Sequence, residues 1–328
     1  MKINFFPCGV GEFILIRDNG VSLAIDSGFQ RTYRSLIKPQ LLELDIINLW
    51  VLTHTDEDHI GGLVKMINDQ DEQLLQDKVN EVWFNHSSLE VQGEDDGISV
   101  RQGMLLRDKL LSLNLISGQE IWNENEPTFI GDIRINILSP NLQKLQESKI
   151  QWNHVEERMI ASYSDYNIPI EILLEREFIE DNSVWNGGSI AILVTKGDKR
   201  IMLLADSHPS VIIKSLQTAP FNCTKDSPLR LDCVKVAHHG SKSNTCYELL
   251  ELIECRDWVF CADGSNHGFP HKECMVSIIN HYKERDQPTR LILNHSTPSY
   301  DQIFGVDKDA KKRFNFEVIH LDDGPYDL

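Results

Sequence analysis

One short segment carries side chains of the types that bind metal ions, at a spacing that lets them converge. Residues 54–59 read His-Thr-Asp-Glu-Asp-His, so the candidate ligands are His54, Asp56, Asp58 and His59. Imidazole nitrogens and carboxylate oxygens are ligands that zinc and manganese accept. The segment contains no cysteine, which favours a catalytic site over a structural one. The sequence therefore predicts a catalytic metal site here.

A plainer interpretation of these four residues has to be weighed against that one. The two histidines can be core or helix-capping residues, and either aspartate can cap the helix expected to begin near His59. A cap needs only one such side chain, whereas this segment has four ligand types in six positions. A Gly-Gly pair follows, where the backbone must pack closely. We therefore favour the metal site.

The segment resembles the H-x-H-x-D-H signature of the metallo-β-lactamase superfamily, with Asp56 in place of the second His. Within that superfamily the chain is most similar to the hydrolase domain at the C-terminal end of ComEC competence proteins, a branch that often has Asp there. The similarity covers residues 1–65 and 184 to about 295. Six further motifs follow the same order, at residues 8–16, 24–28, 186–190, 203–207, 234–241 and 266–271.

The resemblance implies an α/β fold, the metallo-β-lactamase αββα four-layer sandwich, with two divalent metal ions as cofactors. Two ions lower the pKa of a shared water, and a hydroxide held near Asp58 is then the expected nucleophile. Asp56 and Asn186 stand where the superfamily has nitrogen donors, so the first of the two sites is richer in oxygen donors. Manganese is then as acceptable as zinc, and we expect either ion. The implied ligands are His54 and Asp56 for one ion, Asp58, His59 and His239 for the other, and Asp206 as the bridge.

Further histidines are candidates for proton transfer or phosphate contact. His238 can be a ligand or a neighbour that donates a proton to a carboxylate, and we prefer the second, because His239 matches the superfamily's last ligand better. His267 and His271 can contact a phosphate oxygen, protonate a leaving group, or be ordinary surface histidines. Ser241 and the lysine after it lie where a phosphate would be bound favourably, and Asn186 is a weak possible ligand.

Strands must position these segments. Strands are predicted where short apolar runs rich in β-branched residues recur, and helices where the apolar spacing is helical. Strands ending before each ligand segment would bring the ligands to one edge of two sheets covered by outer helices. The predicted strands are 3–6, 12–17, 21–25, 48–53, 189–195, 200–205, 231–237, 257–262 and 289–294. The predicted helices are 33–44, 60–76, 208–217, 244–254 and 271–284.

The middle of the chain is less regular, and we expect a single domain over residues 1–328 with an insertion at about 85–183. Within residues 119–181 there are thirteen Asp and Glu against five Lys and Arg. A solvated acidic insertion is favoured over a substrate lid or a surface for a protein partner.

Composition narrows the substrate and the compartment. The net charge of -18 argues against a broad surface for duplex DNA, because nonspecific affinity for nucleic acid comes mostly from Lys and Arg. Seven cysteines without a C-x-x-C pair fit neither a disulfide framework nor a zinc ribbon, so a reducing cytoplasm is expected. No run approaches the ~20 apolar residues of a membrane-spanning helix, so no membrane insertion is expected.

These observations predict a metal-dependent phosphodiesterase or nuclease that acts on single-stranded DNA or short phosphodiesters. One alternative is hydrolysis of another bond, in a non-phosphate ester, a lactone or a thioester, since one fold hosts many chemistries. Another is an effector subunit that depends on a partner docked on the acidic insertion. The sequence indicates no oligomeric state.

Overall fold

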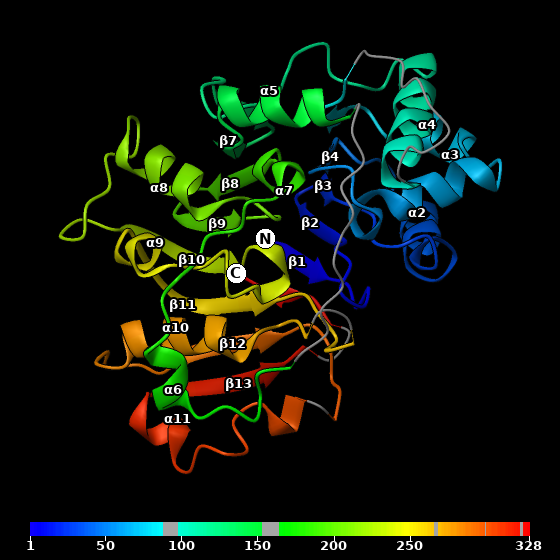
Figure 1. The fold of residues 1–328 in the computed structure, drawn as a ribbon. Coiled ribbons are helices and arrows are strands. Elements are labelled where there is room, and N and C mark those ends of the chain that lie inside the picture. The colour runs from blue at the N-terminus through cyan, green and yellow to red at the C-terminus, as the bar shows by residue number, and fades with distance from the viewer. Residues whose placement is uncertain (88–97, 153–163, 266–267, 299, 322–323) are drawn as a thin grey trace.

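Two β-sheets lie face to face in the part of the chain that the computed structural model describes (Figure 1). The described residues are 1–87, 98–152, 164–265, 268–298, 300–321 and 324–328. Across the first sheet the strands are β14 (Tyr326–Asp327), β1 (Lys2–Phe5), β2 (Ile14–Asp18), β3 (Val21–Ile25), β4 (Leu49–Leu52) and β5 (Val82–Phe84). Across the second they are β13 (Phe316–His320), β12 (Thr289–Leu293), β11 (Ile253–Phe260), β10 (Leu229–Lys235), β9 (Lys199–Leu203), β8 (Ala191–Lys196), β7 (Ile133–Ser139) and β6 (Thr128–Ile130).

Helices cover the outer face of each sheet. Against the first sheet pack η1 (Tyr33–Ile37), α1 (Lys38–Glu43), α2 (Glu57–Asn68), α3 (Gln73–Lys78) and α4 (Ile98–Ser112). Against the second pack α6 (Ile170–Leu174), α8 (Pro209–Gln217), α9 (Tyr247–Glu251), α10 (Lys272–Tyr282), η3 (Tyr300–Gln302) and α11 (Ala310–Arg313). The remaining helical segments are α5 (Leu142–Gln151), which contacts α7 (Val184–Gly187), and η2 (His238–Gly240).

Three buried apolar clusters separate four layers. Because side chains alternate along a strand, each central strand serves two clusters. On β8, Ile192 and Val194 belong to the cluster between the sheets, whereas Leu193 packs beneath the outer helices. The outer cluster of the first sheet joins residues such as Leu52 to Leu63 of α2. The predicted αββα four-layer sandwich is therefore confirmed.

The predicted elements of the two strand-rich halves lie close to the observed ones, with two differences. The helix expected over residues 60–76 divides into α2 and α3, because Gln70 has a positive φ of 60°, which no α-helix accommodates. The helix expected over residues 244–254 is shorter, since Ile253 begins β11 by pairing with Leu229 of β10.

The described part of residues 85–183 is built into the layers of the sandwich. β7 pairs antiparallel with β8, Ile135 lying opposite Val194, and α4 contacts α2. Asp165 accepts hydrogen bonds from the backbone N–H of Lys272 (2.8 Å) and Glu273 (2.9 Å), so it ties this stretch to the start of α10.

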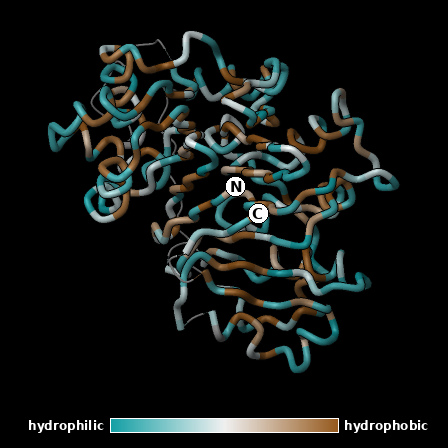
Figure 2. The backbone as a smooth tube through the Cα atoms, turned by 180° about the vertical axis from the view of Figure 1, so that it is seen from behind, coloured by the Kyte–Doolittle hydropathy of each residue, from teal (hydrophilic) through white to brown (hydrophobic). Residues whose placement is uncertain are grey.

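The two ends of the chain meet in the first sheet, where Lys2 of β1 lies opposite Asp327 of β14. Figure 2 shows both ends side by side, with the apolar strands running through the middle of the molecule. No helix in the described ranges is long and apolar enough to cross a membrane.

Candidate metal centre

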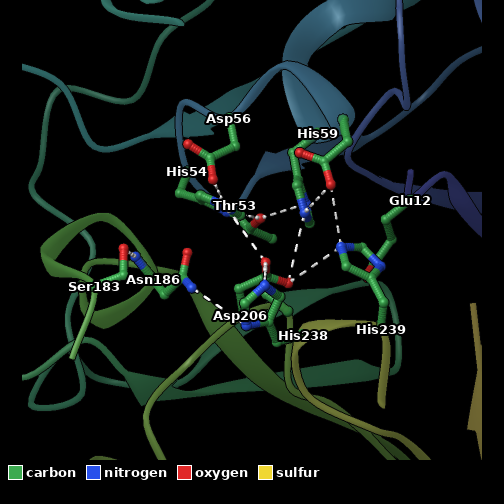
Figure 3. A network of polar contacts seen from close by, with 12 residues as sticks. Glu12, Thr53, His54, Asp56, His59, Ser183, Asn186, Asp206, His238 and His239 are labelled. Atoms are coloured by element: carbon green, nitrogen blue, oxygen red, sulfur yellow. Dashed lines mark hydrogen bonds and ion pairs between the residues drawn. The ribbon is translucent and has the colours of Figure 1, made fainter. Parts of the chain in front are cut away.

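The ligand-bearing segments follow three strands that belong to different sheets. β4 of the first sheet leads into residues 54–59, and α2 begins at Glu57. β9 and β10, which run parallel in the second sheet, lead to Asp206 and to residues 238–239. Figure 3 shows side chains from both sheets pointing toward a common point. All six predicted ligands are thus brought together, as expected for strands that end at one edge.

The start of α2 is held by close backbone packing. A Cβ on Gly62 would collide with the carbonyl oxygen of Ser27, and one on Gly61 would lie 2.7 Å from the backbone nitrogen of Gln30. In return, the Ser27 N–H donates to the carbonyl oxygen of His59 (2.6 Å). The Gly-Gly pair therefore lets the loop after β3 fix the position of His59.

Asp206 lies between two groups of imidazoles and offers one oxygen to each (Figure 3). Its Oδ2 is 3.8 Å from Nε2 of His54 and 3.7 Å from Nε2 of His238. Its Oδ1 is 3.5 Å from Nε2 of His59 and 3.7 Å from Nε2 of His239. This geometry suits a carboxylate that bridges two ions.

The two other aspartates lie at opposite ends of this arrangement. Oδ2 of Asp56 is 3.3 Å from Nε2 of His54, and Oδ2 of Asp58 is 3.2 Å from Nε2 of His239. The donor atoms of His54, His59 and Asp206 all lie within 4.8 Å of one another, as do those of Asp58, His59 and His239. Two overlapping sets of possible ligands are therefore present.

The residues fit divalent cations, because several donor atoms are buried without a partner. Nε2 of His54, His59 and His239 and Oδ1 of Asp206 are buried and form no hydrogen bond within the described ranges. Leaving a polar atom in that state costs about 1–3 kcal/mol, and native proteins rarely gather several at one point. Two bound cations would accept electron pairs from these atoms between them.

Each imidazole is held through its other ring nitrogen, so that Nε2 faces the centre. A carboxylate or carbonyl oxygen that accepts from Nδ1–H fixes the tautomer that leaves Nε2 free to bind a metal. The atoms close to Nδ1 are Asp26 Oδ2 for His59 (2.6 Å), Cys261 O for His239 (3.1 Å), Asp181 Oδ2 and Asn244 Oδ1 for His238 (3.2 Å each) and Thr53 Oγ1 for His54 (3.1 Å).

The charges of the centre also call for a cation. Burial disfavours the charged form of Asp206, yet His238, His239 and His59 hold its pKa well below the usual range. Burial likewise disfavours protonated His238, but Asp206 and Asp181 raise its pKa to about 9. The carboxylates thus stay ionised, and their negative charge favours protonation of the neighbouring imidazoles. Bound metal ions would supply that positive charge in place of the protons.

Backbone strain gathers at the same place. Asp26, Ala205, His238 and His239 have positive φ values of 54°, 46°, 46° and 54°. Non-glycine residues rarely adopt this conformation, which costs about 1–3 kcal/mol each and clusters at functional sites. The surrounding structure therefore holds these residues in unfavourable conformations beside the candidate ligands.

Solvent reaches the centre from one side. The side chains of Asp58 and His238 are 21% and 24% exposed, whereas those of His54, His59 and Asp206 are at most 3% exposed. Among the described residues, Asp58 and His238 are therefore the members of the centre that a substrate could contact most readily.

The other residues singled out from the sequence lie around this opening or outside the described residues. Nδ2 of Asn186 donates to Oδ2 of Asp181 (2.7 Å) and lies 3.3 Å from Nδ1 of His238, so Asn186 contacts the support of His238. Oγ of Ser241 accepts from the N–H of Ser243 (3.2 Å).

His271 lies at the rim of the opening. Its Nδ1 accepts from the backbone N–H of Lys242 (3.1 Å), and its ring lies 5.0 Å from that of Phe269, which lies 5.0 Å from His238. His267 lies outside the described residues.

Two supporting carboxylates were missed in the sequence. Asp26 follows β3 in a motif noted only for its resemblance, and its place after a strand end was a usable sign of a role at this edge. Asp181 lies in the acidic stretch, where nothing distinguishes it from twelve other acidic residues.

Replacing Asp26 by Asn is expected to lower metal affinity by about 10- to 100-fold, because the amide cannot replace the carboxylate that orients His59. Asn tolerates the positive φ at this position, so folding should survive. Metal titration followed by calorimetry measures the change. Asp198→Asn, in the exposed turn between β8 and β9, is the control, and equal affinity in the two variants would contradict the role of Asp26.

No protein-family model matches the sequence, and no curated protein matches it. Similar solved structures include the metallo-β-lactamase fold protein YhfI from Bacillus subtilis, at 14% identity over 99% of this chain and 98% of that one, with a TM-score of 0.44. Zinc-bound PqqB from Methylobacterium extorquens is similar at 12% identity over the whole of both chains, with a TM-score of 0.47. A diphosphatase of the PhnP family is similar at 12% identity over 83% of this chain and 90% of that one, with a TM-score of 0.40. Likenesses at this level leave the activity to be decided by the residues of the site.

Proposed function

We propose that this protein is a metal-dependent hydrolase that cleaves phosphodiesters with a pair of divalent ions, zinc or manganese. The observation that carries the proposal is Asp206, whose two oxygens face separate groups of buried imidazole nitrogens. Strained backbone at four residues of the same centre supports a functional rather than a structural role. The resemblance to the ComEC branch stays a prediction.

The two sets of donors suggest which residues hold each ion. Asp58, His59, His239 and Oδ1 of Asp206 would hold one, as the resemblance implies. For the other, His54, Asp56 and Oδ2 of Asp206 leave room for a fourth donor. Nε2 of His238 lies 3.7 Å from that oxygen, while Asp181 occupies its Nδ1 side. We therefore assign His238 as a ligand, the alternative that was not preferred from the sequence.

The side chains at the opening suit hydrolysis of a phosphodiester. Two bound ions would lower the pKa of water and stabilise charge on the attacking and leaving oxygens. Asp58, exposed at the opening, would orient the attacking water and accept its proton. Because Nδ1 of His271 accepts from Lys242 N–H, a neutral His271 carries its proton on Nε2 and could donate a hydrogen bond from there to a phosphate oxygen.

The negative net charge of the chain favours small or single-stranded phosphodiesters as substrates. With a net charge of -18, few Lys and Arg are available to bind a long phosphate backbone, and the exposed Lys242, whose backbone N–H donates to His271, is one cationic residue near the centre. Single strands and short phosphodiesters need fewer such contacts than duplex DNA. We therefore place single-stranded DNA and small phosphodiesters ahead of duplex.

Turnover of bis(4-nitrophenyl) phosphate and of labelled single-stranded DNA, with manganese or zinc, tests the proposal. Asp58→Ala and His59→Ala are expected to lower turnover by about 10³-fold or more, because both remove an interaction with the ions. Asp198→Ala should keep full activity. If Asp58→Ala and His59→Ala also keep full activity, the assignment of the centre is wrong.

A lactone and a thioester in the same assay separate the substrate class from the metal chemistry. Hydrolysis of either one without phosphodiester turnover would make the phosphodiester assignment wrong and leave a metal-dependent hydrolase. No turnover of any substrate, with two ions bound, would favour a protein that acts only with a partner.

A further inference from the structure

A polar cavity of about 270 Å³ lies on the outer face of the second sheet, at the end away from the metal centre. Its polar lining comes from Arg134 and Asn136 of β7, Thr195 of β8 and Arg200 of β9. Figure 1 shows these three strands side by side in the upper part of the second sheet. Leu193, Pro220, Phe221 and Leu229 complete the wall with apolar groups.

The strand register places the two arginines on one row. Arg134 lies opposite Thr195, and Thr195 lies opposite Arg200. Residues directly opposite one another in neighbouring strands share a face, and strands lie ~4.8 Å apart. The Cα atoms of Arg134 and Arg200 are therefore about 10 Å apart, with the hydroxyl of Thr195 between them. Two guanidinium groups on side chains at that separation can both donate hydrogen bonds to one tetrahedral anion.

None of these four side chains has a partner within the described residues. The guanidinium groups of Arg134 and Arg200 form no ion pair or hydrogen bond there, and Nε of Arg134 is buried. Asn136 is only 7% exposed, and its amide forms no hydrogen bond to any described residue. Asp232 of the neighbouring strand accepts from the backbone N–H of Arg200 (2.8 Å) and pairs with Lys199 (3.2 Å), so its carboxylate is paired with neither guanidinium group. In a chain with 50 Asp and Glu against 32 Lys and Arg, two arginines on one row that form no ion pair with a described residue through their guanidinium groups indicate a binding role. Unsatisfied buried donors cost about 1–3 kcal/mol each unless a ligand accepts from them.

We infer that this cavity binds a phosphate group and is a second site, separate from the metal centre. Guanidinium groups bind phosphate oxygens in pairs, and the Asn136 amide and Thr195 hydroxyl supply further donors. Asp206 lies six residues beyond Arg200, about 20 Å along an extended chain, so one small ligand cannot reach both sites. Phe221 and Leu229 offer apolar surface to an organic group that carries the phosphate.

Calorimetric titration of the whole protein with inorganic phosphate tests this site, with and without prior treatment with a chelator. Binding that survives the chelator is expected in the wild type and should weaken about tenfold or more in Arg134→Gln and in Arg200→Gln. Thr195→Val should weaken it less. Arg230→Gln, an exposed arginine of β10 that pairs with Glu254, is the matched control and should leave it unchanged.

The melting temperature without phosphate checks the folding of each variant, and it should change little because neither guanidinium has a partner to lose. Thymidine 5′-monophosphate, thymidine and a single-stranded oligothymidylate then distinguish the source of the phosphate. Arginine-dependent binding of the monophosphate alone indicates a small phosphate ester, and arginine-dependent binding of the oligonucleotide indicates a nucleic-acid backbone. If chelator-treated protein does not bind phosphate, or if the arginine variants bind it equally well, the inference is wrong.

Discussion

Asp206→Asn is expected to reduce turnover by about 10³-fold or more and to leave fewer than two ions per chain. The carboxylate is the group in the centre whose two oxygens face both sets of imidazoles, so its loss affects both ions rather than one. Asparagine keeps the shape but carries one oxygen and no charge. Elemental analysis of the purified variant, beside its rate with bis(4-nitrophenyl) phosphate, measures both effects.

The control for this prediction has to separate metal loss from misfolding. Asp206 is 2% exposed, so the circular dichroism spectrum and the melting temperature of the metal-free variant should be compared with those of the metal-free wild type. Equal values in the two metal-free proteins would place the effect in the centre. A variant that keeps two ions and full turnover would rule out the bridging role.

Lys235→Met is expected to lower the free energy of unfolding by about 3–5 kcal/mol, the largest effect on stability that we predict. Lys235 and Glu12 are both fully buried and form an ion pair beneath the metal centre. Burial disfavours the ammonium, but Glu12 holds the pKa of Lys235 above its usual value. Removing the lysine leaves Glu12 as an uncompensated buried charge. Urea denaturation followed by circular dichroism measures the loss.

The double variant Lys235→Met with Glu12→Leu is the decisive control. Replacing both members of a buried ion pair by apolar side chains is often neutral, so the double variant should recover most of the lost stability. The backbone N–H of Glu12, which donates to the carbonyl oxygen of Asp58 (3.0 Å), is kept in both variants. A double variant as unstable as the single one would show that the buried charge is not the cause.

The sequence was sufficient for the parts of the fold with strong local patterns. Runs such as residues 21–25, with β-branched and apolar residues between turn-forming neighbours, predict β3 correctly because a buried strand has few other sequence forms. Four candidate ligands, His54, Asp56, Asp58 and His59, were also predictable, since several metal-binding side chains after one strand are hard to explain otherwise, whereas Asp206 and His239 were implied only by the resemblance. In both predictable cases the evidence lies in residues that are close together in the sequence.

Other features of the fold and of the site depend on contacts between residues that are far apart in the sequence. β7 is an exception, because residues 133–137 alternate apolar and polar side chains and so carry a local strand pattern that the acidic excess around them concealed; Ile133 and Ile135 pack into the cluster between the sheets. Asp181 contacts His238 although the two residues are far apart in the sequence, and no local sequence pattern marks Asp181 for this role. The role of His238, as a supporting residue or as a ligand, depends in the same way on neighbours that cannot be derived from the His-His-Gly sequence alone.

The donors of the metal centre come from both sheets, residues 54–59 from one and Asp206 and His239 from the other. Bound ions would therefore fasten the two halves of the sandwich to each other as well as serve the chemistry. Ligands that bind only the folded state shift the folding equilibrium in proportion to their supply. In a cell starved of the ion, such a protein would lose abundance through degradation as well as losing activity.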